Sequence, residues 1–208
     1  MRTALRVGIA IYNDGHYHAA HDAWEGHWLD LESGTPEERL LHGLIQFTAA
    51  VYHACDRNWE GAVGLATSAG EYLDGIDAEY RGCNVDEVGR YLRALATDPE
   101  GIERGQPLAL THEGERLTLA DLTPEETVVA ANVLAEEWDY DEELFERAGD
   151  AALEALDEGD EGTPFLALLF DFVRGDESDR AVIYQRLEAL VDRRESRRRD
   201  VEGLFDEN

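Results

Sequence analysis

The chain of 208 residues is long enough to bury a sizeable hydrophobic core, and 43% of its residues are hydrophobic, as in ordinary globular proteins. Its 47 acidic residues outnumber its 18 basic residues, all of them arginine, so the formal net charge is -29 at pH 7. This excess argues against binding of nucleic acid, because phosphate recognition needs clustered positive charge. We interpret the acidity as halophilic, an adaptation to molar intracellular salt that screens the repulsion between carboxylates.

Cysteine usage and the lack of targeting segments predict a cytoplasmic protein. The two cysteines, Cys55 and Cys83, are too few for a disulfide framework in a chain of this size. No stretch approaches the ~18 consecutive apolar residues of a membrane-spanning helix, and the N-terminus lacks the pattern of a secretory signal. We therefore expect no membrane partner.

The first half of the chain predicts a succession of helices. Apolar residues recur at three- and four-residue spacing, and turn or capping residues separate the periodic segments. Thr35-Pro36, with Glu38 at the capping-box position, starts the third segment. The expected helices are residues 2–12, 16–31, 37–55, 58–73 and 85–96. The third is apolar on most sides, so we expect it to be central and largely buried.

The sequence pattern changes near residue 98, where we place a domain boundary between 1–97 and 98–208. A single core shared by the two parts is the alternative. Short alternating apolar stretches on both sides of Glu113-Gly114 predict a small β-hairpin near residues 107–119. Further helices are expected over residues 123–138, 141–156, 163–174 and 179–204. The predicted fold is all-α, an antiparallel helical bundle with one small β-hairpin.

Two segments of residues 98–208 have a composition that suggests packing or ion pairing. The apolar run over residues 165–173 is expected to form either the core of this part or the face of a homo-oligomer. Five arginines lie between residues 193 and 199, interrupted by Glu195. We expect them to form a striped helix end whose arginines pair with acids.

Four polar side chains on the second and third predicted helices are expected to face a common gap. His21 falls within the apolar face of the second helix, and Glu25 follows one turn later. Gln46 and His53 lie on one stripe of the third helix, together with His42. Two helices joined by a short turn run antiparallel, so His21 and Glu25 are expected to face Gln46 and His53. Two imidazoles and one carboxylate can hold Zn²⁺, Mn²⁺ or Fe²⁺ with positions left for water.

The same residues resemble the signature of a known family. The pattern consists of His21-Asp22-x-Trp24-Glu25-x-x-Trp28, then Arg39-x-x-x-Gly43-Leu44-Ile45-Gln46, then Tyr52-His53 and Asn58-x-x-Gly61-Ala62. It is similar to DUF309, a family of small all-helical domains, over about residues 8 to 75. The resemblance implies a helical bundle with His21, Glu25, Gln46 and His53 at its polar signature positions. Members of the family are classed as predicted metal-dependent hydrolases, and Asp22 stands where they more often have glutamate.

Two functions are compatible with these residues. In the first, His21, His53 and Glu25 bind one divalent metal ion for hydrolysis of a small-molecule substrate, with Gln46 orienting water or substrate. Glu25 could instead serve as the general base. In the second, the protein is a non-catalytic structural or interaction protein. The four side chains then form a buried polar network that holds two helices in register.

Overall fold

The computed structural model describes the backbone of residues 1–205 and the side chains of residues 1–200. The chain divides into two compact units, unit 1 (Met1–Leu122) and unit 2 (Thr123–Asn208). The predicted all-α fold class is confirmed, since most residues up to 205 are helical and their one sheet has two short antiparallel strands. Among the described residues, no helix is long and apolar enough to cross a membrane.

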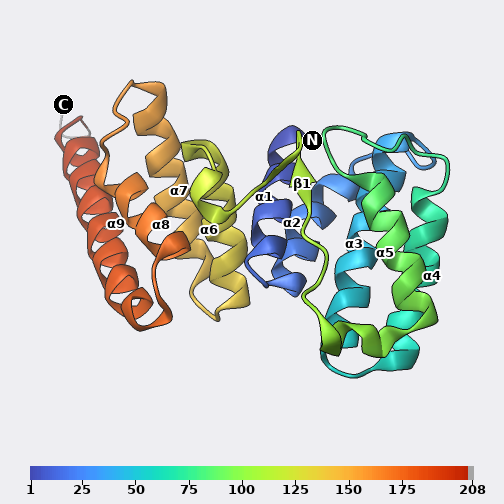
Figure 1. Ribbon diagram of the computed structural model, residues 1–208. Coiled ribbons are helices and arrows are strands. Elements are labelled where there is room, and N and C mark those ends of the chain that lie inside the picture. The colour runs from blue at the N-terminus through green and yellow to red at the C-terminus, as the bar shows by residue number, and fades with distance from the viewer. Residues whose placement is uncertain (206–208) are drawn as a thin grey trace. The chain divides into compact units, whose positions relative to one another are not determined.

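Unit 1 begins with a series of helices that each pack on the next one along the chain (Figure 1). They are α1 (Arg2–Asn13), α2 (Tyr17–Leu29), α3 (Pro36–Cys55), α4 (Trp59–Leu73) and α5 (Val85–Thr97). This order of packing is that of antiparallel neighbours joined by short connections, as predicted. Trp24 of α2 and Phe47 of α3 are fully buried and belong to the core. α3 has most of its faces buried, which confirms its central place.

The helix starts of unit 1 follow from local capping. The Thr35 hydroxyl accepts a hydrogen bond from the Glu38 amide at 3.3 Å, and Pro36 occupies the first turn of α3. Asn58 caps α4 by accepting a hydrogen bond from the Gly61 amide at 3.1 Å. Each cap satisfies a backbone donor that the helix itself leaves without a partner, which sets the first residue of the helix.

The predicted hairpin is present and is very short. It consists of β1 (Thr111–His112) and β2 (Glu115–Arg116), which pair antiparallel. The turn residues Glu113 and Gly114 have φ values of 56° and 81°. Positive φ at both central positions is typical of the type I′ turn, whose twist matches that of two paired strands.

The segment around the hairpin belongs to unit 1, because two side chains at the end of α1 bind it. The Tyr12 hydroxyl donates to the Leu108 carbonyl at 2.8 Å. The Asn13 amide group donates to the carbonyls of Leu110 and Leu117, both at 2.8 Å, and accepts from the Leu110 amide at 2.9 Å. The compact units therefore divide after Leu122, whereas the sequence pattern placed the boundary at residue 98. Two short 3-10 helices complete this segment, η1 (Pro99–Arg104) and η2 (Leu119–Asp121).

Unit 2 contains α6 (Pro124–Glu137), α7 (Glu142–Asp157), α8 (Pro164–Arg174) and α9 (Glu177–Phe205). α6 begins at a capping box, in which Thr123 and Glu126 each accept a hydrogen bond from the other's backbone amide. The rings of Phe145 and Phe172 lie 4.4 Å apart at the centre of the unit. The apolar run of α8 contributes Phe165, Leu166, Leu169, Phe172 and Val173 to the buried core.

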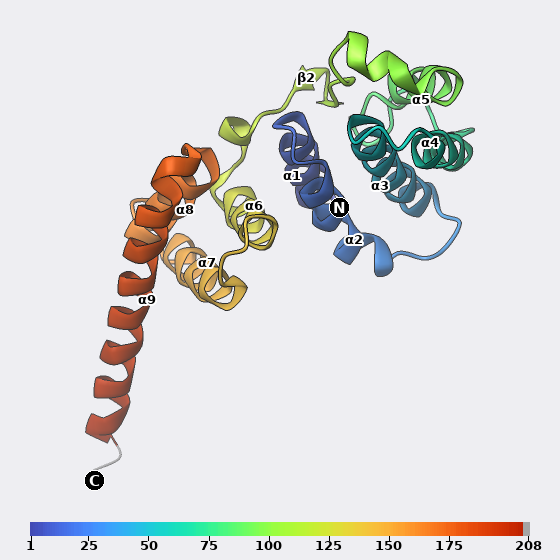
Figure 2. The same cartoon turned by 90° about the horizontal axis from the view of Figure 1, so that it is seen from below.

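α9 is the longest helix and only its first part is covered by other helices of unit 2. Ile183, Leu187 and Val191 are buried where α9 packs on α7 and α8. The C-terminal half of α9 extends beyond the other helices of the unit (Figure 2). Its arginines lie where the helix leaves the core.

Candidate functional site

Three side chains of α2 form a group suited to metal binding. His21, Asp22 and Glu25 each offer one ligand atom, and these atoms all lie within 4.8 Å of one another. Nε2 of His21 is 3.8 Å from a carboxylate oxygen of Glu25. The group arises from helix geometry, because Glu25 lies four residues after His21 and three after Asp22, and residues at these spacings are neighbours on a helix surface. It is accessible to solvent, since 32% of the His21 side chain and 48% of the Glu25 side chain are exposed.

A fourth residue of α2 holds one of these carboxylates. Nδ1 of His18 lies 3.1 Å from Oδ2 of Asp22, one helical turn away. The rings of His18 and His21 are 6.2 Å apart between centroids. α2 therefore presents two His–carboxylate pairs side by side, His18–Asp22 and His21–Glu25.

The other two predicted site residues take partners elsewhere. Nδ1 of His53 lies 3.0 Å from the side-chain amide of Asn58, which caps α4. Nε2 of Gln46 lies 3.0 Å from Nε2 of His42, on the same helix. Neither Gln46 nor His53 belongs to the group on α2. Gln46 and His53 are also distant from each other, because seven residues of α helix separate their backbones by about 10 Å along α3.

A second polar network, which the sequence analysis missed, follows one face of α3. Glu38, His42 and Gln46 are four residues apart and contact one another in series. The Glu38 carboxylate accepts hydrogen bonds from the Trp28 indole at 2.9 Å and the Gly34 amide at 3.1 Å. Its Oε1 also lies 3.4 Å from Nδ1 of His42. Only 8% of the Glu38 surface is exposed, and both of its carboxylate oxygens have polar partners, as is usual for a buried polar group.

The surroundings of Glu38 favour its charged form. Burial alone raises the pKa of a carboxyl group, but the hydrogen bonds from Trp28, Gly34 and His42 have the larger combined effect. The pKa of Glu38 is therefore lowered from the ordinary glutamate value. The sequence pattern assigned Glu38 only to the start of α3. The four-residue spacing of Glu38, His42 and Gln46 was the available signal for the network.

The His42 imidazole is enclosed by aromatic rings at the edge of a pocket. It stacks on Tyr72 with 3.8 Å between ring centroids, and Trp28 lies 4.6 Å away on a tilted plane. The pocket has a volume of about 530 Å³. It is lined by Trp28, Ser33, Gly34, Glu38, Arg39, His42, Ser68, Glu71 and Tyr72. If Nδ1 of His42 carries the proton toward Glu38, Nε2 accepts from the Gln46 amide.

Unit 1 is thus a small, mainly helical domain with two clusters of polar side chains, one on α2 and one along α3. Residues 5–65 match the family model DUF309, described as a domain of unknown function. The match includes both polar clusters, and it leaves Tyr72, the hairpin and the whole of unit 2 outside. No curated protein matches the chain.

Proposed function

We propose that unit 1 binds one divalent transition-metal ion at His21, Asp22 and Glu25, and that the metal site catalyses hydrolysis of a small molecule. The observation that carries the proposal is the convergence of three ligand atoms within 4.8 Å. One imidazole and two carboxylates suit Zn²⁺, Mn²⁺ or Fe²⁺, and three protein donors leave coordination positions open. Asp22 takes the place that His53 had in the ligand set predicted from the sequence.

Each residue of the group has a distinct part in this proposal. A bound ion would supply a water molecule of lowered pKa as the nucleophile. His18 would orient the Asp22 carboxylate through their 3.1 Å contact, as outer partners of metal ligands commonly do. Glu25, exposed at the rim, could accept the proton of the attacking water if it is not itself a ligand. Gln46 and His53 would act only indirectly, through the packing of α3.

The experiment compares metal binding by the intact chain with that of two histidine variants. After chelator treatment and dialysis, titration calorimetry with Zn²⁺ and Mn²⁺ should detect about one site per chain in the wild type. His21→Ala should weaken binding at least about tenfold, because second-sphere changes alone can have that effect and His21 is a direct ligand. His53→Ala is the matched control and should bind as the wild type does, since His53 contacts Asn58.

Three results would each reject part of the proposal. If the wild type binds neither ion, or if His53→Ala loses as much affinity as His21→Ala, the metal site on α2 is wrong. If the metal binds but does not accelerate hydrolysis of p-nitrophenyl acetate or bis-p-nitrophenyl phosphate over metal-free protein, the hydrolase part is wrong for these ester classes.

A second candidate function is a purely structural one for the polar residues, favoured by the contacts of Glu38, His42 and Gln46. These side chains are largely satisfied by one another and by Trp28, so they can hold α2, α3 and α4 in register without any ligand. The protein would then be a non-catalytic interaction protein. Metal-free protein with an unchanged melting temperature after addition of Zn²⁺ and Mn²⁺ would favour this function.

We further propose that the protein works in the cytoplasm of a salt-adapted cell. The support is the net charge of -29 together with basic residues that are all arginine. Raising KCl from 0.1 M to 1 M shortens the screening length from about 10 Å to about 3 Å, which weakens repulsion between surface carboxylates. The melting temperature should therefore rise with KCl and rise less in sucrose of equal osmolarity. A melting temperature that falls with KCl would contradict this assignment.

A further inference from the structure

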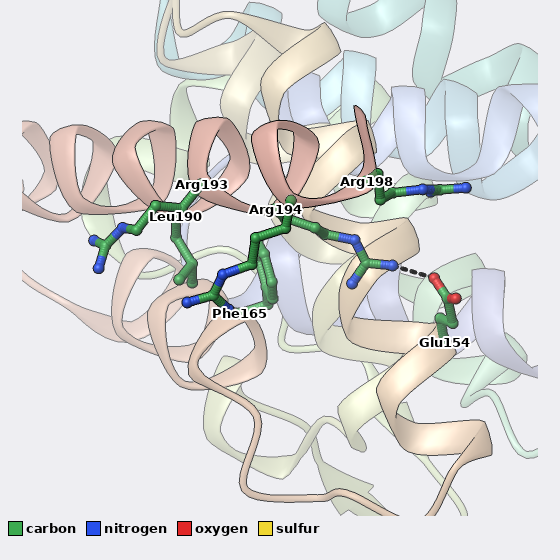
Figure 3. A pocket seen from close by; sticks show the side chains of 7 residues that line it. Glu154, Phe165, Leu190, Arg193, Arg194 and Arg198 are labelled. Atoms are coloured by element: carbon green, nitrogen blue, oxygen red, sulfur yellow. Dashed lines mark hydrogen bonds and ion pairs between the residues drawn. The ribbon is translucent and has the colours of Figure 1, made fainter. Parts of the chain in front are cut away.

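Unit 2 contains a pocket that combines an apolar floor with several arginines (Figure 3). Its volume is about 540 Å³, within the range of about 300–1,000 Å³ that is usual for small-molecule sites. The lining residues come from α7, α8 and α9. They are Glu154, Phe165, Leu190, Arg193, Arg194, Arg197 and Arg198. Four arginines and a single carboxylate thus line the pocket, in a chain where acids greatly outnumber bases.

One of the four arginines is fixed in place by two neighbours. The Arg194 guanidinium donates a hydrogen bond to the Glu154 carboxylate on α7. Its Cζ also lies 5.8 Å from the centroid of the Phe165 ring. Figure 3 shows Arg194 reaching toward Glu154, with Arg193 and Arg198 to either side. A guanidinium held in this way loses little conformational freedom when a ligand binds.

The remaining arginines are not neutralised within the described part of the chain. Arg193, Arg197 and Arg198 form no ion pair with any residue up to 200, and all are exposed. Glu195, the acid within the cluster, is directed to Arg147 on α7 at 2.9 Å. The expectation that these arginines pair with acids therefore holds for Arg194 and not for the three others.

We propose that this pocket binds a small organic phosphate, namely a phosphate monoester joined to an aromatic or apolar body. Guanidinium groups bind phosphate oxygens through paired hydrogen bonds, and a doubly charged phosphate matches several of them better than a carboxylate does. Phe165 and Leu190 offer apolar surface for the body of the ligand. A polyanion such as nucleic acid fits poorly, because the chain has a net charge of -29. The site is independent of the metal site proposed for unit 1.

Phenyl phosphate is the probe for the first experiment, used with the full chain in 1 M KCl. At this ionic strength general charge attraction reaches only about 3 Å, so measured affinity reports direct contacts. Calorimetry should show phenyl phosphate binding more tightly than benzoate, inorganic phosphate or phenol. Equal binding of phenyl phosphate and phenol would overturn the proposal, as would the absence of phenyl phosphate binding.

Three sets of variants locate the site. Replacing both Arg197 and Arg198 by glutamine should weaken binding about tenfold or more, which corresponds to loss of about 1.4 kcal/mol. In the control variant, Arg186 and Arg199 are replaced by glutamine instead. Both lie on the same helix and outside the pocket, so the control should change binding less than about twofold. Glu154→Gln should tighten binding, because the glutamine amide oxygen can still accept the hydrogen bond that holds Arg194, while the negative charge that repels the phosphate is removed. The proposal fails if the control weakens binding as much as the pocket variant, or if Glu154→Gln weakens it.

Discussion

Replacement of Gly8 by alanine is expected to lower the free energy of unfolding of unit 1 by about 3 kcal/mol, the upper range for overpacking a tight core. A Cβ atom at Gly8 would lie 2.1 Å from Nε1 and 2.2 Å from Cε2 of Trp24. Trp24 is fully buried, so its ring can give way only by displacing other core side chains. The close approach of α1 and α2 therefore depends on the missing side chain at Gly8. Urea unfolding followed by circular dichroism measures the change.

Gly64→Ala is the matched control for this substitution. Gly64 lies in the middle of α4, and a Cβ atom there would meet nothing within 4 Å. Alanine at such a position should stabilise the helix by about 0.5–1 kcal/mol, because it restricts the unfolded chain and favours the helix. The two variants should therefore shift the midpoint in opposite directions. A Gly8→Ala protein as stable as the wild type would show that α1 and α2 are packed differently.

Replacement of Glu38 by alanine should cost about 2 kcal/mol of stability at pH 7, because it removes a buried charged acceptor, and hydrogen bonds to charged groups are each worth about 1.5–3 kcal/mol. The Glu38 carboxylate accepts from the Trp28 indole and the Gly34 amide and also contacts His42. Glu71→Ala is the control from the same pocket. Glu71 is exposed, and its carboxylate forms no hydrogen bond or ion pair with any residue up to 200. Thermal unfolding of the two variants should separate them clearly.

The stabilisation by Glu38 should depend on pH in a definite direction. Because the pKa of Glu38 is lower in the folded protein than its ordinary value of 4.5, its contribution is complete above that value. The contribution is lost as the pH falls through the lowered pKa of the folded state. The difference in stability between wild type and Glu38→Ala should therefore shrink on acidification below pH 4.5. A difference that stays constant or grows in acid would mean that Glu38 does not act through its charge.

Local sequence signals were sufficient for the helices and the hairpin. Thr35-Pro36, Asn58 and Thr123 with Glu126 start helices within one or two residues of the predicted positions. Glu113-Gly114 forms the turn between the two short strands. These signals work because capping and turn geometry involve only residues that are neighbours along the chain.

The groups of side chains that could carry function depended on local spacing within a helix and, for Glu38, on packing between helices. The spacing of His21 and Glu25 on one helix places them together, whereas the partners of Gln46 and His53 were decided by their own neighbours, His42 and Asn58. Glu38 became a buried acceptor only because Trp28 lies against it. Such contacts are each worth about 1 kcal/mol, so small differences in helix register and rotamer select among them. Periodicity along the chain shows which side chains share a helix face, but it does not show which of the neighbouring partners each one contacts.

The boundary between the two units also depended on contacts that the sequence did not reveal. Tyr12 and Asn13 are the last residues of α1 and in the sequence mark only its end. Their side chains nevertheless bind carbonyls about a hundred residues later in the chain and keep the hairpin segment in unit 1. The arginines of α9 were likewise recognisable in the sequence as a cluster. The sequence did not show that Glu154 pairs with Arg194 or that Glu195 pairs with Arg147 on α7. Residues close together in sequence thus specified the elements of this protein. The unit boundary, the burial of Glu38 and the pocket of unit 2 were set by contacts between elements, because those contacts form only once the helices have packed.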